Sequence, residues 1–138
     1  IEPTPVHALA AKYGIDVLQP EKLRDDMDQI YKAFREAEVV IWASPLYYWT
    51  LSGQLRICID RLFALVEGGG TSFYGKSCAL LMAAEGDGFE KTVDYFDFLM
   101  EKMHWNNLGK VLASGCGKPG DVEKTAFYEE AKKLGASL

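Results

Sequence analysis

The sequence predicts an α/β fold in which helices cover an open, mostly parallel sheet. Short apolar runs alternate along the chain with segments whose apolar residues recur at helical spacing, and this order builds parallel strands joined by right-handed crossovers. Two runs, Val39 to Ala43 and Cys78 to Ala84, are continuous rather than alternating, which indicates strands covered by helices on both faces. With 138 residues, we expect one compact domain over residues 1–138.

The first 37 residues predict two helices with one short strand between them. Thr4-Pro5 marks the start of the first helix, which is expected to end at Gly14. The run from Ile15 to Gln19 predicts a strand. The second helix is expected to begin near Asp25 or Asp26 and to end near Ala37. Its apolar stripe consists of Met27, Ile30, Tyr31 and Phe34.

The rest of the chain predicts three further strands, each followed by a helix. The strands are expected at residues 38–43, 77–84 and 110–114, and the helices at residues 51–66, 89–104 and 122–134. Asn106-Asn107 is expected to end the middle helix, and Asp121 to cap the last one. The prediction is therefore four strands and five helices in a three-layer α/β/α arrangement.

Composition excludes several classes of function. The net charge is −5 and the pI is near 5.0, and there is no run of Lys or Arg that could follow a nucleic-acid backbone. The apolar runs are far shorter than the roughly 20 residues that cross a bilayer. The three cysteines are widely spaced and odd in number, which favours a reducing, cytoplasmic setting. The chain begins Ile1-Glu-Pro, so we expect no secretion signal.

The loop Ser44-Pro-Leu-Tyr-Tyr-Trp-Thr50 is the strongest functional feature. Ligands of open parallel sheets bind beyond the carboxyl ends of the strands, and this loop places three aromatic residues there, where turns prefer Gly, Asn and Asp. Tyr47, Tyr48 and Trp49 offer flat apolar faces with polar edges, which suit a fused aromatic ring. A subunit contact or a packed Ω-loop is the structural alternative.

A second strand-end loop, Ala84-Glu-Gly-Asp-Gly88, has glycines that allow its backbone to approach a ligand closely. An ordinary turn in which Asp87 caps the next helix explains the same residues equally well. Asp60-Arg61 is interpreted as a structural ion pair. His7 and His104 lack partners at metal-ligand spacing, so no metal site is expected.

The segment AEVVIWASPLYYWTLSGQLRICIDR at residues 37–61 resembles the signature of the NAD(P)H-dependent FMN reductase and multimeric flavodoxin superfamily. The likeness continues through Gly75-Lys76 and Gly117-Lys-Pro-Gly-Asp121, and covers roughly residues 25–138. It implies a flavodoxin-like open parallel sheet, an oxidoreductase with FMN as cofactor and NAD(P)H as electron donor, and a small-molecule acceptor such as a quinone. It also implies a homodimer or higher homo-oligomer.

The resemblance also implies which residues hold FMN. No side chain is expected to act as a catalytic acid or base, since the flavin would carry the electrons. One group of residues would lie against the isoalloxazine ring and a second near its pyrimidine end. The first group is Pro45, Leu46, Tyr47, Tyr48 and Trp49, and the second is Glu85, Gly86, Asp87 and Gly88. Ser44 is expected to be a cofactor-binding residue as well.

The N-terminal residues depart from the family pattern, in which a first strand leads into a Ser/Thr/Asn-rich loop that holds the FMN phosphate. Residues 4–24 instead resemble a segment of methionyl-tRNA formyltransferases. Together these likenesses imply a recombined or engineered chain, with residues 1–24 of foreign origin, and weakened or lost FMN binding. The alternatives are a cofactor-free α/β domain and an interaction module that uses the aromatic loop.

Overall fold

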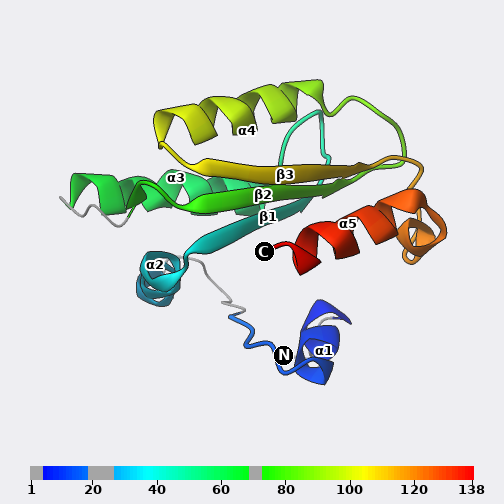
Figure 1. Cartoon of the computed structure of the whole chain (residues 1–138), viewed down its shortest axis with the longest axis horizontal. Helices are drawn as coiled ribbons and strands as arrows, with labels where there is room; N and C mark the ends of the chain where they lie inside the picture. The colour runs from blue at the N-terminus through cyan, green and yellow to red at the C-terminus, as the bar shows by residue number, and fades with distance from the viewer. Residues whose placement is uncertain (1–4, 19–26, 69–72) are drawn as a thin grey trace. The chain divides into compact units, whose positions relative to one another are not determined.

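The computed structural model describes residues 5–18, 27–68 and 73–138 (Figure 1). By their internal contacts the residues fall into two units, Ile1–Ala33 and Phe34–Leu138. The second unit contains the sheet and the strand-end loops, so it carries the candidate site. No helix among the described residues is long and apolar enough to cross a membrane.

The N-terminal unit confirms the first helix but not the strand expected after it. Helix α1 (Pro5–Lys12) is followed by Gly14, whose φ of 66° suits glycine. The amide of Ile15 then donates to the carbonyl of Ala10 at 3.0 Å, so it closes the helix end instead of pairing with a strand. Residues 15–18 are not a strand, and Thr4 and residues 19–26, including the expected helix caps, lie outside the described residues.

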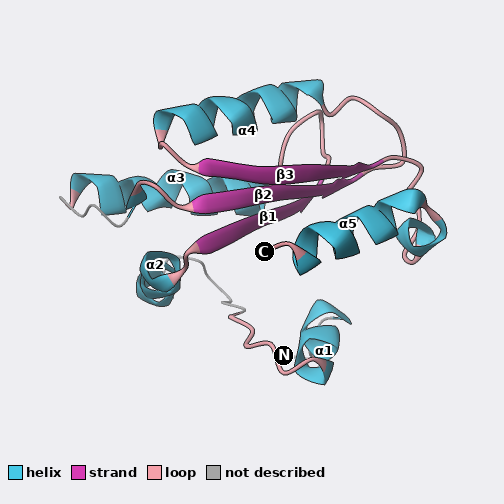
Figure 2. Cartoon of the chain, viewed as in Figure 1, coloured by secondary structure: helices cyan, strands magenta, loops and turns pink. Residues whose placement is uncertain are grey.

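The three later strands are confirmed as one parallel sheet. They are β1 (Val39–Pro45), β2 (Ser77–Ala83) and β3 (Asn106–Ala113), in the order β1-β2-β3. Figure 1 and Figure 2 show α4 (Glu90–Lys102) along one side of this sheet and α5 (Ala126–Ala136) along the other. Together with α3 (Gly53–Glu67), they give the flavodoxin-like open α/β arrangement.

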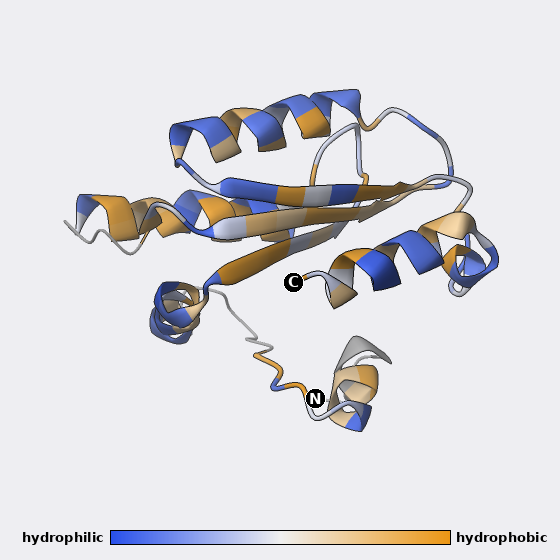
Figure 3. Ribbon diagram, in the orientation of Figure 1, coloured by the Kyte–Doolittle hydropathy of each residue, from blue (hydrophilic) through white to orange (hydrophobic). Residues whose placement is uncertain are grey.

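The expectation that β1 is covered on both faces is wrong for the described residues. Trp42 and Ser44 are buried, whereas the intervening Ile41 is 48% exposed. Helix α5 packs mainly on β3, so one face of β1 is left open. Figure 3 shows hydrophobic colouring over the first part of this strand. The continuous apolar run therefore indicated a strand correctly but not how much of it is covered.

Strand β3 begins four residues before the predicted start at Lys110. Asn106 pairs with Ser77, and the register then shifts by one residue before Gly109 pairs with Ala79. The amide of Gly109 donates to the Asn107 side chain at 3.0 Å, and its φ of 138° lies outside the range that other residues readily adopt. Helix α4 ends at Lys102, before the asparagines that were expected to end it, and these asparagines begin the strand instead.

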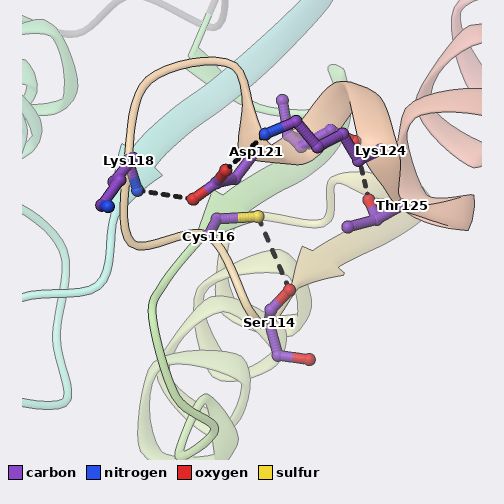
Figure 4. A network of polar contacts seen from close by, with 7 residues as sticks. Ser114, Cys116, Lys118, Asp121, Lys124 and Thr125 are labelled. Carbon is purple, nitrogen blue, oxygen red and sulfur yellow. Dashed lines mark hydrogen bonds and ion pairs between the residues drawn. The ribbon is translucent and has the colours of Figure 1, made fainter.

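The final helix is divided rather than continuous. A 3₁₀ turn (Asp121–Lys124) precedes α5, and Thr125 between them is extended. Figure 4 shows the polar contacts that hold this turn. Asp121 accepts hydrogen bonds from the Lys118 amide at 2.8 Å and from Lys124 Nζ at 3.0 Å. Asp121 thus closes a local loop and does not cap an α-helix, contrary to the prediction.

Aromatic rings form much of the core on the side of the sheet that α4 covers. Trp42 of β1 meets Phe96 of α4 edge to face at 5.5 Å between ring centroids, and Trp105 lies 6.2 Å from Trp42. Phe34 of α2 (Met27–Glu36) stacks on Phe73 at 5.5 Å. The predicted stripe of α2 is confirmed at its ends, because Met27 and Phe34 are both buried.

Lys76, part of the resembling Gly75-Lys76 pair, joins the end of α2 to the sheet. Its Nζ donates to the carbonyls of Ala37 at 2.6 Å and Arg35 at 3.3 Å, and it lies over the Phe34 ring. Arg35 lies in the last turn of α2 and Ala37 follows the helix, and carbonyls at a helix end have no partner within the helix. Burial lowers the pKa of Lys76. This residue has a structural role at the amino end of the strands.

Candidate functional site

The carboxyl ends of the three strands are joined by backbone hydrogen bonds. Pro45, Ala83 and Ala113 are neighbours in the sheet register. Beyond them, the Leu46 amide donates to the Ala83 carbonyl at 3.1 Å, and the Ala84 amide to the Ala113 carbonyl at 2.9 Å. The three following loops therefore start from one rigid edge, which is the place where parallel sheets bind ligands.

The aromatic loop folds into a tight turn with strained backbone. Tyr47 and Thr50 exchange two backbone hydrogen bonds, at 3.0 and 3.1 Å. The two residues between them, Tyr48 and Trp49, both have positive φ, 48° and 59°. Turns of this kind favour Asn-Gly, and each bulky residue at positive φ costs about 1–3 kcal/mol. Strain of this kind is typical of functional sites.

Ser44 fixes the base of this turn. Its hydroxyl donates to the Pro45 carbonyl at 2.7 Å and accepts from the Ser52 amide at 2.8 Å. Ser52 in turn caps α3, because its side chain accepts from the Leu55 amide at 3.4 Å. The Ser44 side chain is 7% exposed, so the structure places it inside the loop base.

A depression of about 310 Å³ lies between the aromatic turn and the second strand-end loop. Tyr48 and Trp49 are 92% and 63% exposed. The depression brings together six of the ten predicted cofactor-binding residues, with Ala84 beside them. Its lining residues are Leu46, Tyr48, Trp49, Ala84, Glu85, Gly86 and Asp87. Two flat rings and a glycine backbone thus share the site with two carboxylates.

The other four predicted residues do not line the depression. Ser44 and Pro45 belong to β1, and Tyr47 pairs with Thr50 to close the turn. Gly88 packs against Trp49: a Cβ built on it would lie 2.8 Å from Trp49 Cδ1. Asp87 does not cap α4, which has no side-chain cap, so its carboxylate remains at the site.

Sequence reasoning missed two contributors to this edge. Thr92 of α4 is 2% exposed, and its hydroxyl donates to the Trp49 carbonyl at 3.0 Å. The spacing of apolar residues in α4 did not indicate this contact. The loop after β3 also reaches the site, since the Cys116 amide donates to the Ala84 carbonyl at 2.8 Å and Gly117 lies against the Glu85 side chain. The glycines of that loop were the feature of the sequence that could have indicated its approach to the site.

The three cysteines are expected to differ in reactivity. Burial raises the pKa of Cys78 to about 12 and also raises the pKa of Cys58. Since the thiolate is the nucleophile, these two react slowly at pH 8. Cys116 is half-buried in the loop after β3. Iodoacetamide labelling followed by peptide mass analysis should therefore modify Cys116 first, and equal labelling of Cys78 in the folded protein would contradict this assignment.

A larger cavity of about 400 Å³ lies between α3 and α4, away from the strand ends. Its walls are mostly apolar, with Ile59 and Phe63 on one helix and Leu99 on the other, and Asp60 and Tyr95 are the polar residues of its lining. It has no convergent set of polar groups, so we assign the candidate site to the smaller depression. Among the described residues no group of three or more His, Cys, Asp or Glu side chains could hold a metal ion.

Comparison with known proteins places the chain among flavoproteins. The sequence profile of the family described as NADPH-dependent FMN reductase matches residues 3–118. This match includes most of the segment expected to be of foreign origin. Nothing in the comparisons supports the formyltransferase resemblance or a recombined chain.

Three similar proteins illustrate the match. An iron-sulfur flavoprotein of Archaeoglobus fulgidus is 30% identical over 117 residues, which are 83% of this chain and 51% of that protein. The chain thus spans about half the length of this relative. The azoreductase of Bacillus anthracis is 27% identical, with a TM-score of 0.61 over 94% of this chain and 71% of its own. The Trp repressor binding protein of Bacillus subtilis is 23% identical, with a TM-score of 0.72 over 79% and 75%.

Proposed function

Because the chain belongs to the NADPH-dependent FMN reductase family, we propose that it is an FMN-dependent oxidoreductase with NAD(P)H as electron donor. The electron acceptor is a small molecule such as a quinone. The observation that carries this proposal is the strained Tyr48-Trp49 turn, which holds two aromatic rings open to solvent at the carboxyl edge of the sheet. A turn with only a structural role would not need large rings at positive φ.

The residues at the depression fit the ring system of FMN. Tyr48 and Trp49 supply apolar faces, and the backbone around Gly86 is open, with no atom within 4 Å of a Cβ built there. Amides of the Glu85–Gly88 loop can donate to ring carbonyls, and the carboxylates of Glu85 and Asp87 can accept from the ring N–H. When bound, FMN supplies the acceptance of hydride and its delivery to the final acceptor.

The chain's own contribution is binding and orientation. The loops are fixed to the strand ends by backbone hydrogen bonds, so ring-contacting groups are held in place before the cofactor arrives, which reduces the entropic cost of binding. The two aromatic side chains also shield one region of the ring from water. No acid or base is assigned, because the electron transfer takes place on the cofactor.

We propose further that this chain holds the ring of FMN more firmly than its phosphate. The side chains that line the depression include two aromatic rings and two carboxylates, and no Lys or Arg is among them, so the lining suits a ring better than a phosphate. FMN and riboflavin should therefore bind with dissociation constants within about threefold of each other, as measured by flavin fluorescence. FMN binding tenfold or more tighter than riboflavin would show a phosphate site and contradict this proposal.

Activity is tested by following NAD(P)H oxidation with a quinone and added FMN. The expected result is a rate well above that of free FMN alone, and a rate equal to free FMN would contradict an enzymatic role.

A cofactor-free role in association is the second candidate, since Ile57 and Phe63 of α3 are both more than half exposed. We propose that these residues support a homo-oligomer. Light scattering should then give a multiple of 15.4 kDa, whereas a monomer would contradict the oligomer.

A further inference from the structure

Thr92 is a buried polar residue whose hydroxyl reaches from α4 to the aromatic loop. Its side chain is 2% exposed, and Oγ1 donates to the backbone carbonyl of Trp49 at 3.0 Å. The two residues are 43 positions apart in sequence, so this hydrogen bond joins two separate elements. Buried hydroxyls need a partner, but most of those on helices bond within the helix. Here the partner is the strained residue of the loop.

Gly88 contacts the same tryptophan from a second direction. Its φ is 108°, and a Cβ built on it would lie 2.8 Å from Trp49 Cδ1 and 3.0 Å from Nε1. The Trp49 ring therefore packs directly on the Gly88 backbone. Glycine has no side chain that could separate the two. The backbone of Trp49 is thus held by the hydrogen bond from Thr92, and its ring is held by the contact with Gly88.

Such double anchoring is needed because the turn is strained. Tyr48 and Trp49 both have positive φ, and backbone of this kind persists only where the surroundings enforce it. The base of the loop is held separately by Ser44 and Ser52. Thr92 and Gly88 contact the outer part of the loop at Trp49, where the rings face the depression.

We propose that Thr92 is a positioning residue, which keeps Trp49 and the neighbouring Tyr48 in the conformation that receives the flavin ring, with Gly88 as the surface against which the Trp49 ring rests. This inference rests on the proposed flavin site. It predicts that loss of the hydroxyl affects ring binding even though Thr92 does not line the depression. Its effect should be equal for FMN and riboflavin, since both carry the same ring.

The test compares Thr92→Val with Thr92→Ser in the full chain. Valine has nearly the same volume and lacks the hydroxyl, whereas serine retains it. Thr92→Val should weaken the binding of both FMN and riboflavin by about fivefold or more, the effect of one hydrogen bond. Thr92→Ser should bind both flavins as the unchanged protein does. Circular dichroism and the melting temperature check that each variant is folded.

A readout without flavin keeps this inference separate from the proposed function. The Thr50 amide donates to the Tyr47 carbonyl across the turn, so its hydrogen exchange reports whether the turn is closed. Exchange at Thr50 should be faster in Thr92→Val and unchanged in Thr92→Ser. If the unchanged protein binds no flavin, the proposed function fails, while faster exchange would still support the positioning role.

Gly88→Ala is a second variant that acts on Trp49 without altering α4. The added methyl group would press on the Trp49 ring, so Gly88→Ala should also weaken the binding of both FMN and riboflavin. Flavin binding and Thr50 exchange in Thr92→Val equal to those of the unchanged protein would overturn the positioning role. An affinity loss in Thr92→Val that Thr92→Ser shares would overturn it as well, because serine keeps the hydrogen bond.

Discussion

Replacing Phe96 with alanine is expected to lower the free energy of unfolding by about 3–5 kcal/mol, the usual cost of removing a large aromatic ring from a core. The Phe96 side chain is fully buried on α4 and meets Trp42 of β1 edge to face. Its removal leaves a cavity between the helix and the sheet. It also removes the ring pair itself, worth about 0.5–1.5 kcal/mol beyond burial.

Urea unfolding followed by tryptophan fluorescence measures this change. Phe98→Ala is a matched control, because Phe98 lies two positions along the same helix and is 55% exposed. The control should change the unfolding free energy by about 0.5 kcal/mol or less. Similar losses in the two variants would contradict the assigned orientation of α4 on the sheet.

Tyr48→Ala is expected to weaken FMN and riboflavin binding by about tenfold while leaving stability nearly unchanged. The ring is 92% exposed, so the folded chain loses little packing when it is removed. In the flavin complex the same ring would become buried against the isoalloxazine. The stacking contact and the area that it buries together contribute about 1–2 kcal/mol to binding. Fluorescence titration measures the affinity, and thermal unfolding measures the stability.

Tyr74→Ala provides the control for this experiment. Tyr74 is also exposed, at 44%, but it precedes β2 and therefore lies at the amino end of the strands. It should leave flavin affinity unchanged. A loss of affinity in Tyr74→Ala, or none in Tyr48→Ala, would place the flavin elsewhere than the aromatic turn.

Strand and helix identity could be predicted where local pattern and burial agree. The apolar run at β2 was correct because the buried environment of the strand matches its pattern, whereas the run at β1 predicted the strand but not its exposed face. The strand predicted at Ile15 was wrong. A strand needs a neighbouring strand as hydrogen-bond partner, but the Ile15 amide donates to the carbonyl of Ala10 at the end of α1. The break at Thr125 was missed because helical spacing continues on both sides of it.

The candidate site was only partly predictable for the same reason. Aromatic residues in a strand-end loop pointed to a planar ligand, and six predicted residues do line one depression. The positive φ values of Tyr48 and Trp49 could not be inferred, because neither residue type favours that conformation. The role of Thr92 depends on how α4 packs against the loop, and no local pattern encodes that contact.

Titration of the 138-residue chain with FMN tests the central claim most directly. Flavin fluorescence should change and saturate at one FMN per chain, and Tyr48→Ala should require more flavin to reach the same saturation. Fluorescence that stays equal to that of free FMN, up to the highest flavin concentration that remains in solution, would contradict the assignment of the strand-end depression as a flavin site.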